Sequence, residues 1–181
     1  MNAKLILVFL VVTGACSGQS DKAKELYNLG VKQNQVGKLD DASILFTQAL
    51  AEEPWYADAF YQRGMSYYGI KQIDSAISDF KQAIELKVKS VNAYTTLIQI
   101  YRNQNDMAKA LEVTEMILKQ LPDNALGAYY TRGQIYEEIG DYTKALKAYR
   151  SAERIAFREM PKFAERLEKR IAAVLSKTKS R

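Results

Sequence analysis

Histidine is absent from this chain of 181 residues, and cysteine occurs only once. The chain therefore lacks the side chain that most often serves as general acid, general base or metal ligand, and a single cysteine cannot form an internal disulfide. Proline is scarce, with three residues, and the charged fraction is 26%, so the composition is not that of a disordered chain. The 48% of apolar residues suffice for one domain with a sizeable core. We expect a folded protein that is not an enzyme and needs no metal or cofactor.

Long apolar runs are missing too, apart from one near the N-terminus. Residues 5–12 are all apolar, Lys4 precedes them, and the small residues Thr13, Gly14 and Ala15 follow. A positive start, a short apolar run and a small-residue cleavage site are typical of a secretory signal peptide. The run is shorter than the roughly 20 residues that span a bilayer as a helix. We expect residues 1–15 to be a signal peptide.

The single cysteine, Cys16, follows this segment directly. Together with Gly14 and Ala15 it resembles the lipobox of bacterial lipoproteins, although Thr13 stands where that family usually has leucine or another aliphatic residue. The resemblance implies acylation of Cys16 and a membrane-anchored lipoprotein that faces the periplasm or the cell surface. Ordinary cleavage before Cys16 would instead give a soluble periplasmic or secreted protein. Residues 16–22 are expected to form a short tether in both cases.

The rest of the chain repeats with a period of about 34 residues. Alanines follow it at Ala42, Ala76, Ala110 and Ala145. Glycines and aromatic residues follow it at Gly30, Gly64 and Gly133 and at Phe46, Phe80 and Tyr149. A period of this length, shared by several residue classes and suited to two short helices, resembles the tetratricopeptide repeat (TPR). The resemblance implies an all-α solenoid of about four helix–turn–helix repeats with a C-terminal capping helix.

The expected repeats cover residues 23–56, 57–90, 91–125 and 126–159. The third departs most from the TPR pattern, with Ile98 in place of glycine, Thr114 in place of the aromatic residue and Ile117 in place of alanine. Aspartates recur just before the expected second helices, where they suit N-caps. These are Asp40, Asp74, Asp106 and Asp141.

A capping helix is expected over residues 160–176, because Phe163, Leu167, Ile171 and Val174 give it one apolar face. A basic tail follows at residues 177–181. Residues 158–181 hold eight basic and three acidic side chains, and the remaining chain holds 18 of each, so the net charge of +5 lies in this segment. The basic face suits anionic lipid headgroups, an acidic partner or simple exposure to solvent.

In TPR solenoids the first helices of successive repeats line a concave groove, and the resemblance implies that their outward positions contact a partner protein or peptide. The positions carried over to this chain are Tyr27, Val31, Asn34, Tyr61, Met65, Tyr68, Gln99, Arg102, Tyr130 and Gln134. The tyrosines at three equivalent positions should form a stripe, and tyrosine is favoured at protein interfaces. The competing interpretation is that these rings only cover the core beneath them. The clamp by which some TPR domains hold a terminal carboxylate is disfavoured, because Tyr27 and Val31 stand at two of its positions.

These observations predict a non-catalytic protein–protein interaction adaptor, exported and lipid-anchored at a bacterial membrane. A soluble TPR binding module and a self-associating structural component of an envelope assembly remain alternatives. We expect no small-molecule substrate, and no nucleic acid for an exported protein. A groove already filled by the chain's own C-terminal segment would overturn this interpretation.

Overall fold

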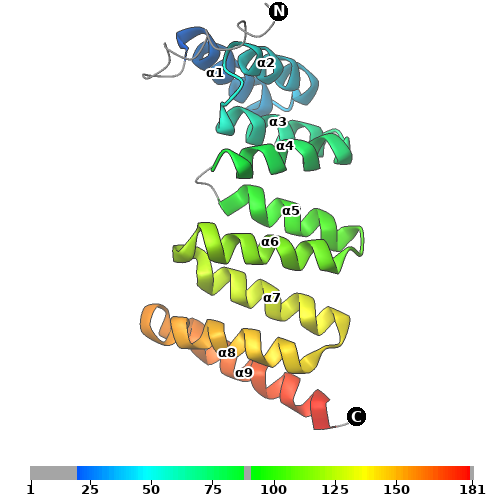
Figure 1. Ribbon diagram of the computed structural model, residues 1–181, viewed down its shortest axis with the longest axis vertical. Helices are drawn as coiled ribbons and strands as arrows, with labels where there is room; N and C mark the ends of the chain where they lie inside the picture. Colours follow the sequence, from blue (N-terminus) through cyan, green and yellow to red (C-terminus); the bar gives the residue numbers. More distant parts are fainter. Residues whose placement is uncertain (1–19, 88–90, 180–181) are drawn as a thin grey trace, which may run out of the picture.

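The computed structural model describes residues 20–87 and 91–179, and within these residues the regular structure is entirely helical (Figure 1). The helices are α1 (Asp21–Gln35), α2 (Leu39–Glu52), α3 (Ala57–Gly69), α4 (Ile73–Glu85), α5 (Val91–Asn103), α6 (Met107–Gln120), the short 3₁₀ helix η1 (Pro122–Asn124), α7 (Ala125–Ile139), α8 (Tyr142–Glu159) and α9 (Pro161–Lys179). None of the described helices combines the length and the apolarity needed to cross a bilayer. The expected all-α repeat architecture is therefore present.

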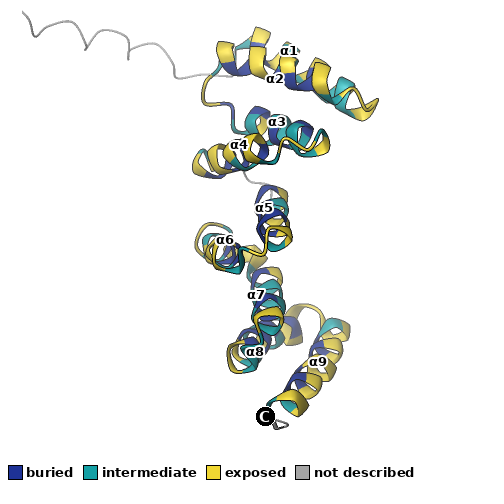
Figure 2. Cartoon of the chain, turned by 90° about the vertical axis from the view of Figure 1, so that its right-hand side faces the viewer, coloured by how far each residue is buried: buried dark blue, intermediate teal, exposed yellow. Residues whose placement is uncertain are grey.

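The helices form consecutive antiparallel pairs that stack from α1 at one end to α9 at the other (Figures 1 and 2). The first helices of the pairs are α1, α3, α5 and α7, and the second helices are α2, α4, α6 and α8. Burial is concentrated between neighbouring helices, whereas the outer faces are exposed (Figure 2). Each pair can bury its apolar face only against its neighbours. In the described residues the buried side chains accordingly follow the stack, in three hydrophobic clusters.

The turn inside each pair contains one residue with a left-handed backbone, always at the equivalent position. Its φ is +79° at Gly37, +63° at Lys71, +59° at Asn105 and +84° at Gly140. This conformation reverses the chain after a helix, and glycine adopts it without the penalty that a Cβ atom brings. The second and third pairs keep the same turn although lysine and asparagine occupy it.

Glycine in the first helix allows an aromatic ring of the second helix to pack directly against the backbone. A Cβ atom at Gly30 would lie 2.7 Å from the Phe46 ring, and one at Gly133 would lie 2.5 Å from the Tyr149 ring. In the third pair the larger side chain comes from the first helix instead. Ile98 stands at the glycine position and Thr114 at the aromatic position, and both are buried. The two departures from the repeat pattern therefore compensate each other in volume.

The expected N-caps are confirmed in two pairs and wrong in the other two. The side chain of Asp106 accepts a hydrogen bond from the Lys109 backbone N–H at 3.1 Å, and Asp141 accepts one from the Lys144 N–H at 3.0 Å. In contrast, α2 and α4 begin after Lys38 and Gln72, which provide no side-chain cap. Asp40 and Asp74 lie inside the first turns of these helices, because α2 and α4 begin before them. There they can still interact with the helix dipole.

Candidate functional site

The ten predicted binding positions all lie on the first helices of the pairs, and we call this surface the first-helix face. Gln99 is exposed, the other nine are half-buried, and none is fully buried. The predicted residues are Tyr27, Val31 and Asn34 on α1, Tyr61, Met65 and Tyr68 on α3, Gln99 and Arg102 on α5, and Tyr130 and Gln134 on α7. All ten side chains are therefore accessible, at least in part, to a partner.

The three equivalent tyrosines make the same contact in their respective pairs. The centroid of the Tyr27 ring lies 5.7 Å from that of Phe46, that of Tyr61 lies 6.1 Å from Phe80, and that of Tyr130 lies 5.8 Å from Tyr149. Each ring thus covers a fully buried ring of the second helix and remains half-buried itself. In the third pair the equivalent residue is the exposed Thr95, which interrupts the stripe.

At the N-terminal end of the stripe, Tyr27 also packs against Tyr56, with the ring centroids 4.9 Å apart. Burial, together with the charge of Asp58, raises the pKa of Tyr27, and burial with the neighbouring Tyr27 and Asp58 raises the pKa of Tyr56 to about 12. Both phenols therefore keep their protons at neutral pH and can act as hydrogen-bond donors.

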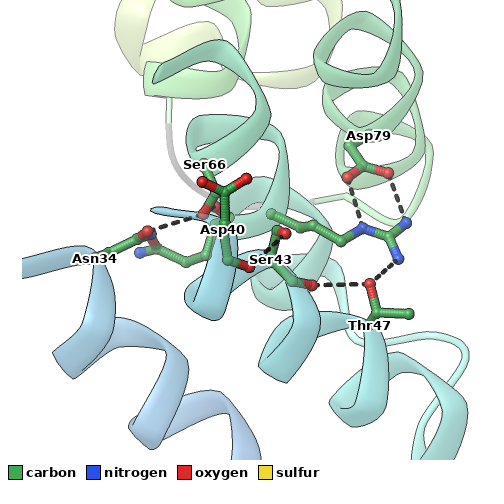
Figure 3. A network of polar contacts seen from close by, with 8 residues as sticks. Asn34, Asp40, Ser43, Thr47, Ser66 and Asp79 are labelled. Atoms are coloured by element: carbon green, nitrogen blue, oxygen red, sulfur yellow. Dashed lines mark hydrogen bonds and ion pairs between the residues drawn. The ribbon is translucent and has the colours of Figure 1, made fainter. Parts of the chain in front are cut away.

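The polar members of the first-helix face connect neighbouring pairs. Ser66 on α3 donates a hydrogen bond of 2.8 Å to the side-chain oxygen of Asn34 on α1 (Figure 3). Arg102 on α5 forms an ion pair with Glu138 on α7. Asn34 and Arg102 thus hold adjacent first helices together, a structural role that the sequence analysis did not assign to them. Gln99 donates to Asn103, one turn further along the same helix, at 2.8 Å.

A buried ion pair lies on the other side of α3, outside the predicted positions. Arg63 donates two hydrogen bonds of 2.8 Å to Asp79 of α4, and one of 3.1 Å to Thr47 of α2. Thr47 and Asp79 belong to the polar network that Figure 3 shows between these helices. Arg132 stands at the position equivalent to Arg63 and donates to Glu115, the equivalent of Thr47, at 2.6 Å. The recurrence of arginine at one repeat position was the signal in the sequence that could have identified this role.

The capping helix α9 meets the first-helix face at its C-terminal end. The ring of Phe163 packs edge-on against Tyr130, with the centroids 5.4 Å apart. Glu137 of α7 accepts hydrogen bonds from Arg170 at 2.9 Å, from Lys177 at 2.8 Å and from the Tyr149 hydroxyl at 3.0 Å. Exposure to solvent was one of the three interpretations of this basic segment, and Lys177 was expected in the tail. The structure shows that α9 continues to Lys179 and that the side chains of Arg170 and Lys177 both reach α7.

Among the predicted binding positions, Tyr130 contacts α9, through the ring of Phe163. The predicted positions on α1, α3 and α5 are not covered by α9 in the described part of the chain. The signal peptide over residues 1–15 and the acylation of Cys16 fall outside the described residues.

The pKa of Glu137 is set by two opposing effects. Burial raises this pKa, whereas the hydrogen bonds from Lys177, Tyr149 and Arg170 lower it. The lowering effect is the larger of the two, so the pKa lies below the ordinary value of 4.5. A carboxyl whose pKa is lowered on folding stabilises the protein above its unfolded-state pKa, and this contribution is lost as the pH falls through the folded-state pKa. The attachment of α9 to α7 should therefore weaken in acid.

Glu137→Gln is expected to lower the free energy of unfolding near neutral pH by about 1–3 kcal/mol, because hydrogen bonds to a charged group contribute this much. The melting temperatures of parent and variant should converge in acid, as the pH falls through the lowered folded-state pKa and the carboxylate of the parent is protonated. Glu168→Gln is the matched control, since Glu168 is exposed on α9. Equal effects of the two substitutions at neutral pH would contradict the role of Glu137.

Two segments match the family model described as "Tetratricopeptide repeat", at residues 57–87 and 126–158. They contain α3 with α4 and α7 with α8. Among curated proteins, neutrophil cytosol factor 2 is 33% identical in Bos taurus and 30% identical in Homo sapiens, over 66 residues that make up 36% of this chain. The matched part is 12% of each relative, so the chain spans about an eighth of their length.

Solved structures share the fold more completely. MamA is 26% identical with a TM-score of 0.64, and the match covers 73% of this chain and 77% of MamA. YrrB, described as a TPR protein with an unusual peptide-binding site, is 17% identical with a TM-score of 0.61 over 86% of this chain and 84% of its own. The first TPR domain of RPAP3, bound to an HSP90 peptide, is 24% identical with a TM-score of 0.58 over 68% of this chain and 99% of its own.

The paired helices, their turns and these matches define the class as a helical-repeat solenoid. Two of the four helix pairs match the tetratricopeptide-repeat model, and the fold is that of a TPR solenoid, as expected from the sequence. Proteins of this fold are generally modules for protein interaction rather than catalysts.

Proposed function

We propose that this protein is a non-catalytic adaptor that binds a peptide or helix of a partner protein on the first-helix face. The observation that carries the proposal is the set of half-buried tyrosines at equivalent positions on α1, α3 and α7. Tyrosine offers a large apolar surface with one hydrogen-bonding group, and it is enriched among residues that dominate binding energy. Two of the similar solved structures are described as binding peptides, which supports the same use of the fold here.

The apolar part of the proposed site is best defined on α3. Tyr61, Met65 and Tyr68 are one turn apart along this helix and are half-buried against the core. The polar residue Gln99 follows on α5. A partner would therefore make apolar contacts on α1 and α3 and hydrogen bonds on α5.

The test begins with a photo-crosslinking amino acid at position 68 in native cells, which captures the partner for identification. The purified partner is then titrated against Tyr61→Ala and Tyr68→Ala, and each should bind at least about tenfold more weakly if these residues dominate the interface. Ile44→Ala is the matched control, because Ile44 is an exposed apolar residue on the second helix α2. Unchanged affinity for both tyrosine variants would place the binding site elsewhere.

We further propose that the protein is exported and anchored at a bacterial membrane by acylation of Cys16. The supporting observations are the apolar run at residues 5–12 and the small residues before Cys16. Helix α1 begins at Asp21, five residues after Cys16, so it includes the last two residues of the expected tether. Mass spectrometry of the mature N-terminus should find an acylated Cys16, and Cys16→Ser should move the protein from the membrane to the soluble fraction. An unmodified cysteine in the mature protein would favour a soluble periplasmic or secreted module.

A further inference from the structure

A pocket of about 400 Å³ lies where α9 meets α7, at the C-terminal end of the first-helix face. Its aromatic wall consists of Tyr130 and Phe163, whose rings pack edge to face. Its charged wall consists of Arg166, Lys169 and Arg170, which are three and four residues apart and therefore lie on one side of α9. The pocket thus combines an apolar surface with three cations.

The positive charge of this pocket is only partly compensated. Arg170 is paired with Glu137, whose carboxylate already accepts hydrogen bonds from Lys177 and Tyr149 as well. Neither Arg166 nor Lys169 has an ion-pair partner in the part of the chain that the structure describes. The acidic residues of α9 close to them in sequence, Glu165 and Glu168, are exposed and do not line the pocket.

All residues that line the pocket except Tyr130 belong to the segment that holds the net charge of the chain. Residues 158–181 carry a charge of +5, from eight basic and three acidic side chains, and the remaining residues are balanced at 18 of each sign. A recess lined by one sign of charge concentrates the electrostatic potential and attracts oppositely charged groups.

From this geometry we propose that the pocket binds an acidic segment of a partner protein, an inference that rests on the proposed adaptor function. A carboxylate of the segment is held between Arg166 and Lys169, since guanidinium and carboxylate groups form strong charge-assisted hydrogen bonds. A neighbouring apolar side chain packs against Tyr130 and Phe163. The first-helix face supplies the apolar contacts for the remainder of the same partner, because Tyr130 belongs to both surfaces.

A protein segment fits the pocket better than a membrane surface does. The cations stand beside an aromatic wall in a recess, and a single extended chain can enter such a recess with its side chains on both walls. Anionic headgroups at a planar surface would instead bind the outermost basic residues without using Tyr130. Vesicle binding is therefore a separate outcome of the experiment.

The experiment measures binding of a fluorescent synthetic peptide that alternates glutamate with phenylalanine, and of its glutamine-for-glutamate counterpart. The acidic peptide should bind and should weaken as salt is added, because partly exposed charges are screened. Arg166→Glu combined with Lys169→Glu should weaken binding at least about tenfold, while the glutamine peptide should bind poorly to every variant. Both substituted side chains are exposed, so the variant should keep the thermal stability of the parent.

The matched control combines Lys147→Glu with Arg150→Glu, which changes the net charge equally at two exposed positions on α8. Equal losses in the two double variants would show diffuse attraction and overturn the proposal. Binding of the parent to phosphatidylglycerol vesicles that is lost only in the Arg166 and Lys169 variant would replace it with lipid recognition. If the partner captured at position 68 depends on Tyr61 and Tyr68 but not on Arg166 and Lys169, this inference fails while the adaptor function stands.

Discussion

Asp79→Ala should lower the free energy of unfolding by about 3 kcal/mol, since removing one member of a buried ion pair leaves the other charge without compensation. The Asp79 side chain is 5% exposed and that of Arg63 is 17% exposed, and two hydrogen bonds of 2.8 Å join them. In the variant, the guanidinium would remain over the rings of Phe60 and Tyr67 with Thr47 as its remaining side-chain acceptor. Denaturation in urea, followed by circular dichroism, measures the loss.

A second variant separates the uncompensated charge from a loss of packing. Arg63→Leu combined with Asp79→Leu removes both charges and keeps apolar volume, so it should recover most of the stability lost in Asp79→Ala. If Asp79→Ala unfolds at the same urea concentration as the parent, the ion pair contributes nothing to stability and Arg63 must find another partner.

Thr114→Phe should destabilise the protein by about 1–3 kcal/mol, because it places an aromatic ring where the third pair has no glycine to receive it. Ile98 occupies the position that glycine holds in the other pairs, and both Ile98 and Thr114 are buried. Ile98→Gly alone should lower the free energy of unfolding by about 3 kcal/mol or more, because it leaves a cavity in the core and places a glycine inside a helix.

The two substitutions together restore the glycine and aromatic pair found in the first, second and fourth pairs. The combined variant should therefore be more stable than the sum of the single effects predicts, by about 1–3 kcal/mol, the coupling expected of residues in contact. Urea denaturation of the parent, both single variants and the double variant completes the cycle. Strictly additive effects would mean that positions 98 and 114 do not share one packing site.

The period of the sequence was sufficient to predict the fold, because each pair repeats the same local interactions. Gly30 with Phe46 and Gly133 with Tyr149 recur at fixed spacing, and their packing follows from that spacing alone. The N-caps were predicted less well, since Asp40 lies two residues after Lys38, which is the N-cap residue of α2, and helix boundaries are uncertain at that level.

The contacts of α9 could not be read from the periodic pattern. The recurrence of arginine at Arg63 and Arg132 indicated a shared role, but it did not identify Asp79 as the partner, because Ala148 stands at the equivalent position in the fourth pair. Glu137 and Lys177 are separated by 40 residues, and their pairing depends on how α9 is oriented against α7. A charged residue on a helix face is usually solvated, so sequence alone favours that interpretation for Arg170. The positions of the binding residues on the first helices followed from the repeat, whereas their use by a partner stays a prediction.

The left-handed turns at Gly37, Lys71, Asn105 and Gly140 share one backbone geometry, whichever residue occupies them. If the segment between any two of these turns were deleted or duplicated, the turn at the new junction would therefore keep the same backbone geometry. Recombination would then lengthen or shorten the array in whole steps, and the span of the partner that it contacts would change by the same increments.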